Sequence, residues 1–350
     1  MKMGLLDRLK EQFAAQEPFN RVLAPFAHEA VKIYEDCVCY PKDKLVKLYC
    51  KEAELRDISN LEELKNRVSE FGEVITEVRD ARFSQVPQRI VLWKEGNMPS
   101  ETEYTDNSDL KYTHDPDYSP FMYEMLLPVD VYPKGAIIMS AGGDHGSNIL
   151  LECYQASLEM NELGYQCFIL MNRPNANPWT GREAGADVAR SIQYVRANAE
   201  KYRISADHVA FAGYSNGGLT GEHNIQHFSG GRTINDSFPE YIPDDLDGFS
   251  GCPDVFLCVY GPRFVGETFD WEGVEYPPTI VIVGEKDFNI PNIAPYAEDL
   301  RSHGVTVEMH TFINCPHGGV GNAILGEVEH PNYYQWRTLC DAFMTEVYRR

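Results

Sequence analysis

The chain has 350 residues, of which 43% are hydrophobic and 12% aromatic. This content is enough for one large hydrophobic core or two modest ones, and it excludes an intrinsically disordered chain. Lys and Arg number 31 against 53 Asp and Glu, which gives a formal net charge of −22. Because such a charge repels phosphate backbones and anionic lipid headgroups, we expect no nucleic-acid partner and no membrane partner.

Sequence features that report on location favour a cytoplasmic protein. No run reaches the roughly 18 apolar residues that a membrane-spanning helix needs. The opening sequence MKMGLLDRLKEQF carries charges where a signal peptide has an apolar core. The nine cysteines are an odd number scattered along an acidic chain. This pattern favours reduced, packed thiols over a disulfide framework.

The first 80 residues have a helical pattern in which charged residues alternate with apolar ones. Pro18, Pro25 and Pro41 interrupt this pattern. Asn60 is a suitable N-cap for the run that follows it, and Gly72 is typical of a helix C-terminus. We therefore predict a helical extension of a few short helices over residues 1–80, separate from a larger domain over residues 81–350.

The rest of the chain predicts an α/β fold with a mostly parallel sheet. Two short β-like stretches, residues 89–93 and 121–129, are expected to form antiparallel edge strands. From Gly135 onward, strands alternate with helices, which implies parallel strands with helices covering both faces of the sheet. The expected strands lie within residues 136–143, 165–172, 208–215, 254–261, 278–284 and 305–312, and the expected helices within residues 150–163, 182–202, 295–303 and 332–349.

The clearest chemical motif is GYSNG, residues 213–217, which places Ser215 between an apolar strand and a glycine-rich helix start. A serine hydroxyl is a weak nucleophile unless a tight turn exposes it beside a base. Glycines on both sides let the strand and helix backbones approach without Cβ clashes. We predict Ser215 as a nucleophile, and a glycine-rich turn without catalytic function is the alternative.

A base and an orienting acid are expected later in the chain, in the order acid and then histidine. Asp287 directly follows the apolar run TIVIVG, and His317 lies in a glycine-flanked loop after VTVEMHTF. In this arrangement His317 takes the proton of Ser215, and Asp287 orients the imidazole and stabilises its cation. Other acids compete with Asp287 for this role, with Asp270 as the reserve and Asp254 and Glu285 as rivals.

Backbone donors for a developing oxyanion are expected in the segment SAGGDH, residues 140–145, which follows the first parallel strand. The amides of Gly143, Asp144 and Asn216 are the candidate donors, and a simple Gly-Gly turn is the alternative. Further candidates for contact with the substrate are Gly142, Trp179 and Tyr214. Trp179 is a candidate for stacking on a sugar or acyl group, with simple packing as its alternative.

An HxxxH spacing also occurs, at His223 and His227, and it offers two side chains of the kind that bind zinc. The helix that carries them is expected to pack on the sheet. The pair also lacks the glutamate of an HExxH motif. Packed histidines are therefore the favoured interpretation, and we predict no metal.

Taken in order, strand-SAGGDH, strand-GYSNGG, strand-GEKD and strand-CPHGG resemble the α/β-hydrolase superfamily over residues 89–350. The segment is most similar to the acetyl esterase and lipase branch, which includes carbohydrate acetyl esterases such as the acetylxylan esterases. The oxyanion loop of that branch usually has three glycines. Here Ala141 precedes only two, and Asp144 takes the third place, which affects the shape of the acyl pocket.

The resemblance implies an α/β-hydrolase fold without a metal or organic cofactor, and it makes the N-terminal helices an addition that serves as a lid or as a contact between subunits of a homo-oligomer. We predict a serine ester hydrolase that cleaves short acyl esters, especially acetyl esters on a sugar or oligosaccharide. Two alternatives stay open. One is a serine peptidase similar to the prolyl oligopeptidases, although the sequence lacks the propeller-like repeats of that family. The other is a non-catalytic binding protein that retains the fold.

Overall fold

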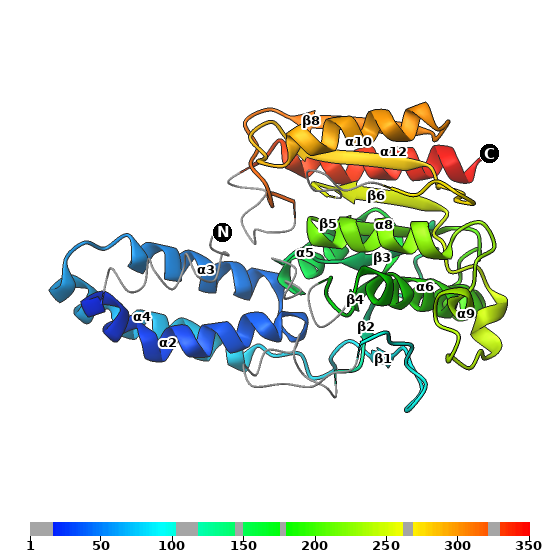
Figure 1. Ribbon diagram of the computed structural model, residues 1–350. Helices are drawn as coiled ribbons and strands as arrows, with labels where there is room; N and C mark the ends of the chain where they lie inside the picture. Colours follow the sequence, from blue (N-terminus) through cyan, green and yellow to red (C-terminus); the bar gives the residue numbers. More distant parts are fainter. Residues whose placement is uncertain (1–16, 103–117, 144–149, 176–179, 262–268, 321–329) are drawn as a thin grey trace. The chain divides into compact units, whose positions relative to one another are not determined.

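The computed structural model describes residues 17–102, 118–143, 150–175, 180–261, 269–320 and 330–350. The chain forms two compact units, residues 1–87 and 88–350. The sequence-based boundary at residue 80 coincides with the last residue of a helix in the first unit. Each unit is described separately below (Figure 1).

The described part of the first unit consists of helices. They are α2 (Glu17–Glu35), the short 3-10 helix η1 (Cys37–Cys39), α3 (Lys42–Arg56) and α4 (Leu61–Asp80). Asn60 caps α4 as predicted, because its side chain accepts hydrogen bonds from the backbone N–H groups of Glu62 and Glu63 at 3.0 and 3.2 Å. The helices pack through buried apolar side chains, among them Leu48, Leu64, Phe71 and Val78.

The predicted helix end at Gly72 is wrong, because α4 continues through this residue to Asp80. A Cβ atom at Gly72 would lie only 2.7 Å from Cε1 of Phe26 on α2. The glycine therefore lets two helices approach each other, and its backbone does not take the left-handed conformation of a C-cap.

In the second unit, eight described strands form one sheet in the order β1-β2-β4-β3-β5-β6-β7-β8 (Figure 1). The strands β1 and β2 pair in antiparallel fashion at one side, and all pairs from β4 to β8 are parallel. This confirms the predicted mostly parallel sheet. The strands are β1 (Arg89–Val91), β2 (Phe121–Met125), β3 (Gly135–Ser140), β4 (Tyr165–Met171), β5 (Val209–Tyr214), β6 (Val255–Val259), β7 (Thr279–Gly284) and β8 (Val307–Phe312).

Helices cover both faces of this sheet (Figure 1). On one face α6 (Gly181–Ala197), α8 (Asn216–Phe228) and α10 (Ile290–Ser302) share an apolar core with the sheet. On the other face α5 (Leu150–Glu162) and α12 (Trp336–Tyr348) meet, where the indole of Trp336 donates to Glu159 at 2.8 Å. Shorter helices are α7 (Ala199–Tyr202), α9 (Ile234–Ser237), η3 (Asp245–Gly248) and η4 (Tyr333–Gln335).

Two of the expected helices are divided in the structure. The helix expected over residues 182–202 is interrupted at Asn198, where φ is −107° and ψ is 21°, so α6 and α7 are separate. The helix expected over residues 332–349 begins as the 3-10 helix η4 and continues as α12. Helix boundaries of this kind depend on local hydrogen bonds that hydrophobic periodicity does not report.

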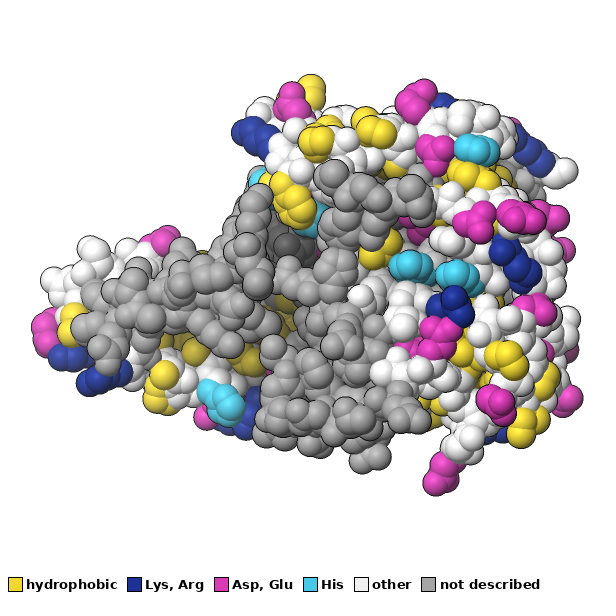
Figure 2. Space-filling view, viewed as in Figure 1, with side chains coloured by type: hydrophobic (Ala, Val, Ile, Leu, Met, Phe, Trp, Pro, Cys, Tyr) yellow, Lys and Arg dark blue, Asp and Glu magenta, His cyan; other side chains and the backbone are white. Residues whose placement is uncertain are grey.

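The surface of the protein mixes both signs of charge. Figure 2 shows acidic and basic side chains interspersed on the face in view. Many of them pair, as Lys134 does with Asp341 at 2.7 Å and Lys94 with Asp244 at 2.9 Å. The net charge of −22 is therefore a property of the whole chain, with local neutralisation at these pairs.

A fully buried ion pair fixes the segment that follows β4. The guanidinium of Arg173 donates to both carboxylate oxygens of Asp187 on α6, at 3.0 and 2.7 Å. Asp187 also accepts the backbone N–H of Arg173 and the indole N–H of Trp93, both at 2.8 Å. Both side chains of the pair are inaccessible to solvent. The charges are thus compensated by directed hydrogen bonds, as buried ions require.

We expect Asp187→Ala to lower the free energy of unfolding by about 3–5 kcal/mol, because it removes the carboxylate that accepts hydrogen bonds from the buried Arg173 guanidinium. Urea unfolding at neutral pH measures the change. Asp207→Ala is the control, since Asp207 is exposed, and it should stay within about 0.5 kcal/mol of the wild type. Equal losses in the two variants would contradict this account.

Candidate active site

Ser215 lies on the tight turn between β5 and α8, in a conformation that non-glycine residues seldom adopt. Its φ is 50° and its ψ is −115°. The backbone N–H of Ser215 donates to the carbonyl of Val259 on β6 at 2.9 Å, which ties the turn to the next strand. Strain of this kind persists only where the surrounding structure enforces it, and it is common at functional sites.

The glycines that flank Ser215 are required by close contacts between backbone segments. A Cβ atom at Gly213 would lie 2.3 Å from the carbonyl oxygen of Gly217. A Cβ atom at Gly217 would lie 2.0 Å from the carbonyl oxygen of Ser140 at the end of β3. The GxSxG pattern therefore has a direct steric reason in this structure.

The three residues predicted as a triad lie in one hydrogen-bonded line. Nε2 of His317 is 2.9 Å from Oγ of Ser215. Nδ1 of His317 is 2.9 and 3.0 Å from the two carboxylate oxygens of Asp287. Since a carboxylate accepts hydrogen bonds, this arrangement places the imidazole proton on Nδ1 and leaves Nε2 free to accept the proton of Ser215.

The sheet explains how residues so distant in sequence meet. Ser215 follows β5, Asp287 follows β7, and His317 follows β8, so all three lie beyond the carboxyl ends of parallel strands. Asp287 is only 3% exposed, and it also accepts the backbone N–H of Asn289 at 2.7 Å. The acid is therefore held rigidly behind the imidazole.

The rival acids have other contacts in the structure. Asp254 pairs with Arg196 at 3.0 Å and accepts the backbone N–H of Val209, at the start of its strand rather than the end. Glu285 accepts the backbone N–H of Asn314 at 2.9 Å. Asp270 is exposed and accepts the backbone N–H of Glu272. Of the four acids weighed, Asp287 is the one that contacts His317.

The candidate oxyanion donors are described in part. Gly143 is half-buried with a φ of 143°, and Asn216 is the first residue of α8, where backbone N–H groups lack partners within the helix. Asp144 lies outside the described residues, as does Trp179. The N–H of Gly142 is already engaged, because it donates to the carboxyl group of Glu152 at 2.6 Å.

The expectation that Tyr214 contacts the substrate is wrong. Its side chain is fully buried. The ring packs against Tyr260 and against Trp336 of α12, on the sheet face away from α8. Successive residues of a strand point to opposite faces, so the residue before Ser215 points into the core. Gly142 does lie against the nucleophile, since a Cβ atom there would be 2.8 Å from Cβ of Ser215.

Several residues beside the triad were not found from the sequence. The rings of Tyr260 and Phe288 lie 4.9 and 4.4 Å from the ring of His317, between centroids. Phe288 is 70% exposed, so it presents an apolar surface next to the imidazole. Phe288 directly follows the predicted Asp287, and this adjacency was the only available signal.

Asn175, in the segment after β4, contacts the residue that follows the nucleophile. Its amide nitrogen lies 3.2 Å from Oδ1 of Asn216 and 2.9 Å from Oγ1 of Thr220. Within the described ranges, Oδ1 of Asn175 and Nδ2 of Asn216 are buried without a hydrogen-bond partner. If both amides are rotated by 180°, one donor and one acceptor are still left over, so the pair has unused polar capacity beside Ser215.

The HxxxH pair shows no third ligand in the part of the chain that is described. His223 and His227 stack with ring centroids 6.2 Å apart, and burial lowers the pKa of each to about 4. Among the described residues no group of three or more His, Cys, Asp or Glu side chains is arranged to hold a metal ion. His223 instead packs against Gly181 at the start of α6.

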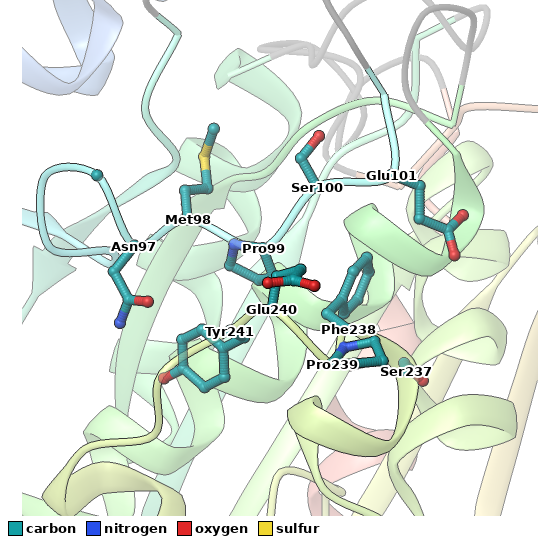
Figure 3. A pocket seen from close by; sticks show the side chains of 11 residues that line it. Asn97, Met98, Pro99, Ser100, Glu101, Ser237, Phe238, Pro239, Glu240 and Tyr241 are labelled. Carbon is teal, nitrogen blue, oxygen red and sulfur yellow. The ribbon is translucent and has the colours of Figure 1, made fainter.

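A pocket of about 340 Å³ lies between residues 96–101 and 237–241 (Figure 3). None of the three triad residues lines it. Asn97 joins the two walls through a pair of hydrogen bonds to the backbone of Ile242, at 2.8 and 3.0 Å. Ser100 and the backbone of Glu101 bind Glu183 of α6. These contacts tie the lining segments to each other and to α6.

Comparisons with known proteins identify the fold. No protein-family model matches the sequence, and no curated protein matches it either. Among solved structures, an acetyl ester-xyloside bifunctional hydrolase from Caldicellulosiruptor lactoaceticus is 21% identical, with a TM-score of 0.56 over 76% of this chain and 98% of that chain. MGS-M1, an α/β-hydrolase enzyme from a Medee basin deep-sea metagenome library, is 17% identical, with a TM-score of 0.50 over 71% of this chain and 98% of that one. The chain has the α/β-hydrolase fold.

A further solved structure with this α/β-hydrolase fold is an esterase from Thermogutta terrifontis, Est2, with propionate bound. It is 17% identical to this chain, with a TM-score of 0.51 over 72% of this chain and 96% of that one. Est2 also has a structure in which it is phosphorylated by paraoxon. Within the described ranges, no helix combines the length and the apolar character needed to cross a bilayer.

We expect Gly217→Ala to destabilise the protein by about 1–3 kcal/mol or more, because the new methyl group would overlap the carbonyl oxygen of Ser140. The matched control is Gly248→Ala, since nothing lies within 4 Å of a Cβ atom at Gly248. Urea unfolding of both variants measures the difference. A Gly217→Ala protein as stable as the control would show that the contact at β3 is not tight.

Proposed function

We propose that this chain is a serine ester hydrolase that works through an acyl-enzyme. Ser215 is the nucleophile, His317 the general base and acid, and Asp287 the residue that orients the imidazole. The observation that carries the proposal is the hydrogen-bonded line from Asp287 through His317 to Ser215, in which every contact is 2.9–3.0 Å long. Such a line, on a strained turn between strand and helix, is the geometry that activates a serine hydroxyl.

In the first half-reaction, Oγ of Ser215 attacks the acyl carbonyl carbon while Nε2 of His317 takes its proton. Asp287 stabilises the resulting imidazolium through the bonds to Nδ1. The negative charge then forms on the former carbonyl oxygen. In this proposal it is met by the amides of Gly143, Asp144 and Asn216, each of which would contribute up to about 3–4 kcal/mol. Collapse of the intermediate breaks the ester bond, and His317 protonates the departing alcohol.

In the second half-reaction, His317 removes a proton from a water molecule that attacks the acyl group on Ser215. The acyl–oxygen bond to Ser215 breaks, and Ser215 recovers its proton from His317. The products are a carboxylic acid and the regenerated enzyme. None of these steps needs a metal or an organic cofactor.

For the substrate, we propose a short acyl ester, with acetyl esters of a sugar or oligosaccharide as the preferred class. Two structural neighbours support this choice, since one is an acetyl ester-xyloside bifunctional hydrolase and another has a structure with propionate bound. The net charge of −22 favours a neutral or cationic substrate over a polyanion.

The proposal also assigns parts of the chain. Residues 81–350 form the catalytic unit, and residues 1–80 are an addition that serves as a lid or as a contact between subunits of a homo-oligomer. The cytoplasmic location stays a prediction from the sequence. A small-molecule ester is the partner that the chemistry requires.

We expect Ser215→Ala to lower kcat on p-nitrophenyl esters by about 10⁴-fold or more, because removing the nucleophile disables the whole triad. A series from acetate to decanoate should show the fastest hydrolysis with acetate, and release of acetate from acetylated xylo-oligosaccharides tests the sugar. Ser205→Ala, an exposed serine before β5, is the control and should keep full activity. If folded wild-type protein cleaves no ester, peptide substrates and pull-downs would decide between a peptidase and a binding protein.

Paraoxon should phosphorylate the protein once, at Ser215. The Ser215 oxygen forms a bond to phosphorus, the bond to p-nitrophenolate breaks, and His317 takes the serine proton. Intact and peptide mass spectrometry locates the diethylphosphoryl group, and absorbance counts the phenolate released. His317→Ala should slow the labelling strongly, since the hydroxyl then lacks its base. Labelling at another serine would contradict the assignment of the nucleophile.

A further inference from the structure

A second carboxyl group, Glu152, is buried beside the site and is not used in the mechanism above. It lies in the first turn of α5 and is only 3% exposed. Its Oε2 accepts the backbone N–H of Gly142 at 2.6 Å. Its Oε1 lies 2.6 Å from the hydroxyl oxygen of Tyr260, and that hydroxyl lies 2.5 Å from the carbonyl oxygen of Val320.

These contacts require a proton that an ionised glutamate cannot supply. A phenol has one proton, a backbone carbonyl only accepts, and an ionised carboxylate only accepts. Tyr260 alone therefore cannot fill both short contacts. If Glu152 is protonated, its Oε1–H donates to the Tyr260 oxygen, and Tyr260 donates to Val320. The other carboxyl oxygen, Oε2, then accepts from Gly142 as a neutral carbonyl oxygen does.

We propose that Glu152 is held in its neutral, protonated form, and that it acts with Tyr260 as a positioning residue for the triad. The hydrogen bonds run in one direction, from Gly142 through Glu152 and Tyr260 to Val320. At one end, this row of hydrogen bonds holds the backbone of Gly142, which precedes the candidate oxyanion donor Gly143 and lies against Ser215. At the other end it holds the segment three residues after His317. The positioning role in catalysis rests on the proposed function. The protonation state of Glu152 is independent of it.

The surroundings of Tyr260 support a positioning role. Its ring lies 4.9 Å from the ring of His317, between centroids, so a movement of the phenol would move the imidazole. Its φ is 41°, which is unusual for a bulky residue, and the backbone is held there by a hydrogen bond from its N–H to the carbonyl of Ile282 at 2.7 Å. Such strain is maintained where the structure fixes a residue for a purpose.

The burial of Glu152 also favours its protonated form, because burial raises the pKa of this carboxyl group above its ordinary value. Among the described residues, the titratable groups that interact with Glu152 are Tyr260 directly after β6, Tyr214 from β5 and His317 from the segment after β8. Burial raises the pKa of both tyrosines well above 10, so neither ionises near neutral pH.

The protonation state is tested by unfolding wild type and Glu152→Gln as a function of pH. An acid whose pKa is raised in the folded state binds a proton there that the unfolded chain has lost, so its stabilising contribution falls as pH rises from about 4.3 to the raised pKa. Relative to Glu152→Gln, the folding equilibrium constant of the wild type should fall by at least about tenfold between about pH 5 and pH 7. A ratio that stays constant or rises with pH would overturn the proposal.

The positioning role is tested by steady-state kinetics on p-nitrophenyl acetate. Tyr260→Phe and Glu152→Ala each interrupt the row of hydrogen bonds from Gly142 to Val320. We therefore expect kcat to fall by about tenfold or more while KM stays within about twofold. Glu152→Gln presents an N–H to Tyr260 and a carbonyl to Gly142, as the neutral acid does, and should exceed Glu152→Ala by at least about tenfold in kcat. Equal kcat values for these two variants, or a wild-type kcat in Glu152→Ala, would overturn the role.

Glu159→Gln is the matched control. Glu159 lies on the same helix and is 4% exposed, and it accepts N–H groups from Trp336 and Gln155. Its substitution changes stability without a selective loss of kcat. If the wild type cleaves no ester, the proposed function fails, while the pH-dependent unfolding still decides whether Glu152 carries its proton.

Discussion

The site depends on how closely the end of β3 approaches the turn after β5. The carbonyl of Ser140 occupies the space that a side chain at position 217 would need, and the backbone of Gly142 lies directly against Ser215. Both contacts are possible because neither glycine has a Cβ atom. The approach brings the candidate oxyanion segment beside the nucleophile before any substrate binds. For the proposed reaction, this approach preorganises the amides of Gly143 and Asn216, which is the condition under which oxyanion donors are effective.

The same close packing explains why the turn keeps its strained conformation. A φ of 50° at Ser215 is unfavourable for a residue with a side chain, by an amount on the order of 1–3 kcal/mol. The strain is balanced by the hydrogen bond from Ser215 to β6 and by the helix that begins at the next residue. Tyr260, directly after β6, has a second positive φ, so the two strained residues follow the carboxyl ends of neighbouring strands. Strand pairing, and not local preference, determines the backbone there.

Much of this could be predicted from the sequence because the decisive signals are local. Ser215, Asp287 and His317 each follow an apolar run, and the carboxyl ends of parallel strands meet at one edge of a sheet. The predictions failed where packing decides. Gly72 lies inside α4 because Phe26 approaches it, and Tyr214 is buried because strand alternation turns it toward α12. Glu152 could not be found at all, because its partner Tyr260 is 108 residues away in sequence.

Two buried carboxyl groups beside one imidazole have opposite requirements. Asp287 accepts hydrogen bonds from His317 and from the backbone of Asn289, so both of its oxygens face donors. Glu152 accepts one backbone N–H and faces a phenol whose only proton is needed elsewhere, which favours its neutral form. The imidazolium that forms during the proposed reaction would therefore meet one full negative charge, on the side of Nδ1. A second ionised carboxylate would stabilise the imidazolium before the reaction as well as during it. Keeping Glu152 neutral thus preserves a histidine that is free to take the serine proton.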